Sequence, residues 1–155
     1  MYKQAKAWLN SCNMVWNTKK DNKNESLSFE AGFNTVSRCN PFAGSFQQYL
    51  IMDGLFEVSD GHMTLVIDNI KIQDIYAGFG AKKEEFNIED RISRLQEAAQ
   101  TKEEAKNNTS LSKKERKKII EDSEDTIDEI EDQLNKGGEE LKERLDKLDK
   151  LMGNQ

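Results

Sequence analysis

The stretch LFEVSDGHMTLVI (residues 55–67) decides the fold that the sequence predicts. Apolar and polar residues alternate on both sides of Ser59-Asp60-Gly61-His62, which is typical of two strands that each bury one face. Asp-Gly accepts the positive φ angles of a tight turn, so we expect the two runs to pair as a β-hairpin. A third alternating run, residues 70–75, follows Asp68-Asn69. Three consecutive strands joined by short turns indicate an antiparallel meander.

Upstream of this hairpin the sequence predicts two helices. Residues 2–16 place apolar side chains at helical spacing, and a polar loop is expected from Lys19 to Ser26. Residues 42–53 bring four large apolar side chains onto one helical face. Asp53-Gly54 is expected to end this second helix, because glycine is a strong local breaker.

The segment between the two helices, residues 26–38, fits either a strand or a helix, because its apolar residues match both spacings. Gly32 favours the strand, since a glycine inside a helix costs about 1 kcal/mol relative to alanine. Asn40-Pro41 then predicts a turn. We therefore expect an α+β fold: a small N-terminal domain with a short antiparallel meander and two helices.

The order of elements within residues 27–67 resembles the winged helix-turn-helix class. The predicted helix at 42–53, followed by Gly54 and a hairpin with Ser59-Asp60-Gly61 at its tip, is similar to a recognition helix and its wing. The resemblance implies contact with nucleic acid. Because the predicted helix contains no Arg or Lys, and phosphate contacts dominate affinity for DNA, the implied binder is a weak one.

Composition changes near residue 86. All 12 aromatic residues lie at or before Phe86, whereas residues 81–155 hold 16 basic and 21 acidic residues. Glycines at Gly78-Phe79-Gly80-Ala81 punctuate the chain at the same place. We therefore predict an aromatic-rich α+β domain at 1–86 and a charged helical extension at 87–155.

The extension is expected to form one helix followed by a helical hairpin. Residues 86–107 have helical spacing. Ser110 or Ser112 can cap the next helix, and Glu115, three residues after Ser112, completes a capping-box pattern. Gly137-Gly138 is expected to end that helix, either as a C-cap or as the hairpin turn.

Apolar residues in this hairpin are spaced three or four positions apart and form the predicted helical interface. They are Ile120, Ile127, Ile130, Leu134, Leu141, Leu145, Leu148 and Met152. They are too few to offset the conformational entropy lost when the hairpin orders on its own. We therefore expect the extension to dock on the first domain, to self-associate or to bind a partner protein.

A run of carboxylates lies in the middle of the extension and is the predicted partner-binding face. Its members are Glu121, Asp122, Glu124, Asp125, Asp128, Glu129, Glu131 and Asp132, and five bases in residues 113–118 precede them. One interpretation is a solvated face that pairs with bases at 142–150, in the last helix or in a second copy. Another is a patch for a basic partner, in which carboxylates stand in for nucleic-acid phosphates.

The residues that usually carry chemistry do not cluster in this sequence. The single histidine, His62, falls in the hairpin turn, and Cys12 and Cys39 have no zinc-type neighbours, so we expect reduced thiols. We predict no catalytic residue, no metal, no cofactor and no small-molecule substrate. No apolar run is long enough for a membrane span, and no N-terminal targeting signal is evident, so a cytoplasmic (or host-cytoplasmic or virion) location is expected.

The leading functional hypothesis is a non-enzymatic assembly or adaptor protein that binds a protein partner or itself through its helical tail. Small virion components and phage accessory proteins have this kind of layout. The alternative hypothesis is an acidic, nucleic-acid-mimicking inhibitor of a nucleic-acid-processing or defence protein. The third is the weak nucleic-acid binder that the winged-helix resemblance implies, although we do not expect nucleic acid to be the main partner.

Overall fold

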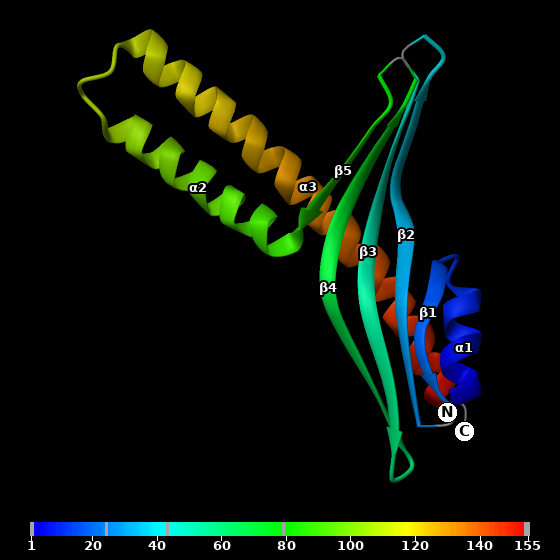
Figure 1. Cartoon of the computed structure of the whole chain (residues 1–155). Coiled ribbons are helices and arrows are strands. Elements are labelled where there is room, and N and C mark those ends of the chain that lie inside the picture. Colours follow the sequence, from blue (N-terminus) through cyan, green and yellow to red (C-terminus); the bar gives the residue numbers. More distant parts are fainter. Residues whose placement is uncertain (1, 24, 43, 79, 154–155) are drawn as a thin grey trace. The chain divides into compact units, whose positions relative to one another are not determined.

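The computed structural model describes residues 2–23, 25–42, 44–78 and 80–153. The predicted α+β class is confirmed: the described residues form one antiparallel sheet and three helices (Figure 1). In chain order the elements are α1 (Tyr2–Ser11), β1 (Val15–Asn22), β2 (Ser26–Asn40), β3 (Gly44–Ser59), β4 (His62–Ala77), β5 (Lys82–Asn87), α2 (Ile88–Asn107) and α3 (Lys113–Gly153).

The sheet is a meander in which the strands lie in chain order, β1-β2-β3-β4-β5, each antiparallel to its neighbours. The predicted hairpin is confirmed, since β3 and β4 pair from Ser59↔His62 outward. Asp60 and Gly61 at its turn have φ angles of 48° and 79°. Positive φ at both central residues matches the right-handed twist of paired strands, which explains why Asp-Gly occupies this turn.

The core lies on one face of the sheet. Alternating residues of β2 and β3 are buried there, and α1 adds Trp8, whose ring meets Phe56 edge-on with centroids 5.6 Å apart. Phe29 stacks on Phe56 at 5.4 Å and fills the space over Gly54. A Cβ at Gly54 would overlap the Phe29 ring, so any larger residue would have to displace this ring.

The C-terminal part of α3 covers the same face. The Trp8 indole donates a hydrogen bond to the backbone carbonyl of Arg144 at 2.6 Å. The Arg144 guanidinium lies 3.9 Å from the centre of the Phe33 ring, a cation–π contact, and Arg144 is buried. Residues 1–87 and 139–155 accordingly form one compact unit, and residues 88–138 form a second.

The predicted first helix is too long. The helix ends at Ser11, and β1 contains Trp16 and the first half of the predicted polar loop, residues 19–22. Asn13 has a φ of 50°, which helical backbone does not allow, so the chain turns there and enters the sheet. Pairing of β1 with β2 outweighs the helical spacing of the apolar residues.

The predicted helix at 42–53 is wrong. Gly44–Ser59 is the central strand β3, hydrogen-bonded on both sides, and Asp53-Gly54 lies in its interior. The spacing of the apolar residues fits a helix as well as a strand, and pairing with the strands on both sides decides for the strand. The described residues of the segment that resembled a winged helix-turn-helix therefore contain no recognition helix. Residues 26–38, left open between strand and helix, are strand β2.

The third predicted run is not a separate strand. β4 continues from His62 to Ala77, and the register with β3 shifts between Ile51 and Asp53. Asn69 opposite this shift has a φ of 51°. Asp68-Asn69 therefore marks a β-bulge rather than a turn.

The second unit, residues 88–138, pairs α2 with the first part of α3. The capping box is confirmed: Glu115 accepts a hydrogen bond from the Ser112 amide at 3.0 Å, and the Glu115 amide donates to the Ser112 hydroxyl at 3.3 Å. The Ser112 hydroxyl also donates to the Glu115 carboxylate at 2.6 Å. This bond first, and the bond from the Ser112 amide second, hold the pKa of Glu115 below its ordinary value. Lys102 of α2 lies 2.8 Å from Glu124 of α3 and lowers the pKa of that carboxyl.

The predicted hairpin turn at Gly137-Gly138 is wrong, because α3 runs without a break from Lys113 to Gly153. Two glycines cost about 1 kcal/mol each inside a helix. Packing of residues 139–153 on the sheet core offsets this cost. None of the helices in the described ranges is long and apolar enough to cross a membrane.

Candidate functional site

The outer edge of β4 is open over much of its length. β5 pairs with β4 only from Lys71 to Tyr76, so in the described part of the chain no strand lies on the outer side of His62–Ile70. The backbone N–H and C=O groups on the outer side of this segment therefore have no strand partner. An open edge of this kind is a template for an added strand.

An apolar groove follows this open edge. Met63, Leu65 and Ile67 share the core face of β4, and α3 supplies Leu145, Leu148 and Met152 beside them. The groove has a volume of about 520 Å³ and one exposed carboxylate, Asp149, among its lining residues. Leu148 is buried, whereas the remaining apolar side chains of the groove are half-buried.

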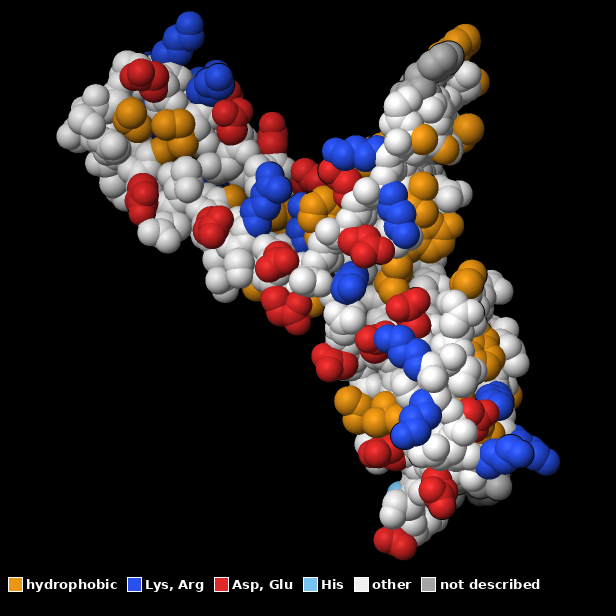
Figure 2. Space-filling view, viewed as in Figure 1, with side chains coloured by type: hydrophobic (Ala, Val, Ile, Leu, Met, Phe, Trp, Pro, Cys, Tyr) orange, Lys and Arg blue, Asp and Glu red, His pale blue; other side chains and the backbone are white. Residues whose placement is uncertain are grey.

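The β4 edge lacks the charges that protect the other edges of the sheet. Residues 63–67 contain no charged side chain, and Val66 on the opposite face is 46% exposed. The outermost strands carry such charges instead: β1 has Lys19 and Lys20, and β5 has consecutive Lys and Glu pairs over 82–85. Exposed edges usually bear charges that discourage pairing with another chain, so the uncharged segment of β4 is the exception. Apolar side chains gather at the lower margin of the sheet, on the β4 side (Figure 2).

The eight carboxylates predicted as a partner-binding face, Glu121 to Asp132, are all exposed on α3 within the second unit. They occupy one half of the helix circumference, and Ser123 and Ile130 are buried on the other half. Glu121, Glu124 and Asp132 each form an ion pair with a lysine of the same unit.

The predicted helical interface is divided between the two units. Ile120, Ile127, Ile130 and Leu134 belong to the second unit, and Leu141, Leu145, Leu148 and Met152 belong to the first. Ile130 and Leu148 are buried and the other six are half-buried.

The bases at 142–150 do not fold back on the acidic run in a hairpin. Arg144 and Lys147 pair one turn away within α3, with Glu140 at 2.5 Å and Glu143 at 2.9 Å. Sequence reasoning also missed the role of Arg144 as a core residue. Its position on the apolar stripe, one residue before Leu145, is the only signal that the sequence offers.

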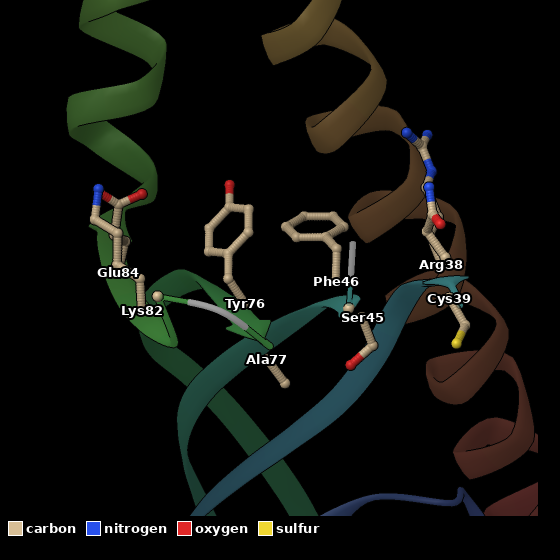
Figure 3. A pocket seen from close by; sticks show the side chains of 11 residues that line it. Arg38, Cys39, Ser45, Phe46, Tyr76, Ala77, Lys82 and Glu84 are labelled. Atoms are coloured by element: carbon tan, nitrogen blue, oxygen red, sulfur yellow. The ribbon is translucent and has the colours of Figure 1, made fainter. Parts of the chain in front are cut away.

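A second hollow lies at the opposite end of the sheet. Figure 3 shows the side chains that line it. Arg38, Phe46, Tyr76 and Lys82 stand in register across β2 to β5, and the Phe46 and Tyr76 rings are 5.0 Å apart. The hollow has a volume of about 550 Å³. Glu84 forms an ion pair with Lys82 and raises the pKa of this lysine, so one of the two bases is already neutralised within the hollow.

The remaining candidate residues are dispersed. His62 is exposed at the β3–β4 turn, Cys12 is buried and Cys39 is exposed, and neither cysteine is in a disulfide. Within the described ranges, no three His, Cys, Asp or Glu side chains are placed to hold a metal ion.

Known proteins give no guide to the function of this chain, so a functional proposal has to rest on the site itself. No family model matches the chain, and no curated protein or solved structure matches it.

Proposed function

We propose that this chain is a non-enzymatic protein-interaction protein that acts in assembly by accepting a further β-strand along the open edge of β4. The observation that carries the proposal is an open edge, uncharged over residues 63–67, with an apolar groove beside it. The proposal retains the assembly role expected from the sequence and moves the binding surface from the helical tail to the sheet.

Strand addition uses both features at once. The backbone of an incoming strand would hydrogen-bond to the free N–H and C=O groups of residues 62–70, which supplies affinity. Its alternate side chains would point toward the core face of β4 and enter the groove beside Leu65 and Leu145. Side-chain pockets beside a strand edge give such binding its specificity.

A peptide copying residues 61–69 tests this proposal directly, with fluorescence anisotropy as the readout on the full-length chain. We expect saturable binding that is lost in Leu65→Lys, because a charge would then occupy the groove. Val15→Lys is the matched control, since Val15 is 74% exposed and lies on β1 at the other edge of the sheet. The variants must keep the circular dichroism spectrum of the native chain. No binding at high peptide concentration, or equal loss in both variants, would contradict the proposal.

A second candidate function rests on the exposed acidic half of α3. A basic protein partner would bind it with strong salt dependence, because opposite charges in water are screened by added ions. The test is the joint neutralisation of Glu121, Asp125, Asp128 and Asp132 to their amides, with binding to a polylysine probe measured from low to physiological salt. Unchanged binding by the neutralised chain would rule out this function.

A further inference from the structure

We infer that the strand accepted by β4 is β4 of a second copy of this chain, paired antiparallel about Leu65. The inference rests on the proposed function and names its partner. Two five-stranded sheets would then join into one sheet of ten strands around a two-fold axis. Such an axis makes one surface complementary to itself, which is the commonest geometry of protein dimers.

The sequence of the edge is symmetric about Leu65. In this register Leu65 faces its own equivalent, Met63 faces Ile67 of the second copy, and Thr64 faces Val66. Opposite residues of an antiparallel pair point to the same face. The three larger apolar residues of each copy therefore meet over the groove, and the smaller pair meets on the other face.

The ends of the paired segment are complementary as well. His62 faces Asp68 of the second copy, and the pair occurs twice because of the symmetry. An imidazole N–H can donate to a carboxylate in either protonation state. Asp68 lies opposite Asp53 in its own sheet, and Lys19 forms its ion pair with Asp53. A donor from another copy would therefore meet a carboxylate at Asp68 that Lys19 does not pair with.

The neighbouring registers fit less well. Pairing about residue 64 would place Asp60 opposite Asp68, two like charges facing each other. Pairing about residue 66 would place Met63 opposite Asn69 and Asp68 opposite Thr64. Only the register centred on Leu65 matches apolar with apolar residues and leaves each Asp68 with a donor.

The helices add a second layer to this interface. Leu145 and Met152 of α3 are half-buried in the groove of each copy, and joining the edges would cover them further. Asp149 is the one charged residue among those that line the groove. An interface made of one strand edge and one helix margin lies at the small end of specific interfaces, so we expect a concentration-dependent dimer.

Cysteine cross-linking tests the register. In a Cys39→Ser background, which leaves only the buried Cys12, we expect Leu65→Cys to give a disulfide-linked dimer under mild oxidation. Thr64→Cys and Val66→Cys should each fail to cross-link alone, and an equal mixture of the two should cross-link. The mixture keeps Leu65, so it remains informative if the Leu65 substitution weakens association. Cross-linking of all three single variants alike, or of neither Leu65→Cys nor the mixture, would overturn the inference.

Light scattering on the native full-length chain separates the inference from the proposed function. We expect the mass to rise from one chain toward two with concentration, and this rise to be lost in Leu65→Lys. A chain that stays monomeric but binds the peptide of residues 61–69 would overturn the dimer and leave strand addition standing. A monomeric chain that binds no peptide would overturn both.

Discussion

The two units of this chain are stabilised in different ways. In the first unit, residues far apart in the sequence share one aromatic core, as when Trp8 of α1 donates its hydrogen bond to Arg144 of α3. In the second unit, the interactions include a local one, the capping box at Ser112, and an ion pair between Lys102 and Glu124 that joins the two helices. Its buried residues include the polar Ser123 and Gln133. We infer that stability resides mainly in the first unit and that the second opens more easily.

The largest expected effect comes from removing the centre of the aromatic core. Trp8→Ala should destabilise the chain by about 3–5 kcal/mol, because it deletes a fully buried ring and the hydrogen bond to Arg144. Trp16→Ala is the matched control, since Trp16 is only half-buried on β1 and bonds to an exposed Asn10. Urea unfolding followed by circular dichroism measures both. Equal losses would contradict a core centred on Trp8.

A smaller loss of stability is expected when a single methyl group is added at Gly54. Gly54→Ala should cost about 1–3 kcal/mol, because the new Cβ would overlap the buried Phe29 ring. Gly32→Ala is the control on the neighbouring strand, where the nearest atom would lie 3.4 Å away in ordinary contact. Thermal unfolding measures the stability of the two variants, which carry the same Gly→Ala change. A loss at Gly32 as large as that at Gly54 would mean that the aromatic contact does not set the cost, because alanine itself suits a strand at least as well as glycine does.

The second unit should respond to local changes that leave the sheet untouched. Ser112→Ala removes the cap of α3 and should cost about 1 kcal/mol within the helical hairpin. Ser110→Ala is the control, because its hydroxyl donates to Asn108 in the preceding loop and is not part of the capping box. Hydrogen exchange resolved by segment is the measurement. Faster exchange is expected in residues 113–138 and not in β2 or β3, and an equal change in both units would argue against their separate stabilities.

What the sequence could predict follows the same division between local and long-range interactions. The Asp60-Gly61 turn and the Ser112–Glu115 cap are local, and both predictions are confirmed. The helix predicted at 42–53 failed because its spacing also suits a strand, and only pairing with β2 and β4 decides between them.

The candidate site shows the same limit. The alternation at Met63 to Ile67 is visible in the sequence, but the open edge exists because β5 stops pairing at Lys71. The groove also needs Leu145 and Met152, which the sequence placed in a hairpin that does not form. The exposure of the carboxylates between 121 and 132 agrees with a solvated face, and whether a partner binds there stays a prediction.

The smallest expected effects are electrostatic, and they test whether the two units respond to acid separately. Lys19 lies 2.5 Å from Asp53 and, together with the Asn69 amide, lowers the pKa of that carboxyl. A carboxyl with a lowered pKa stabilises the fold above its unfolded value of about 3.9, and this contribution disappears as the pH falls through the folded pKa.

Asp53→Asn should therefore lower the stability of the first unit at neutral pH and make its decline below about pH 4 shallower. Glu124→Gln should do the same for the second unit only, because Lys102 lowers the pKa of Glu124. Both groups are near the surface, so water and salt screen them and the shifts in melting temperature should be small. Hydrogen exchange at pH 3 and pH 6 assigns each change to its unit. If either substitution altered the acid response of the other unit, the two units would have to unfold as one.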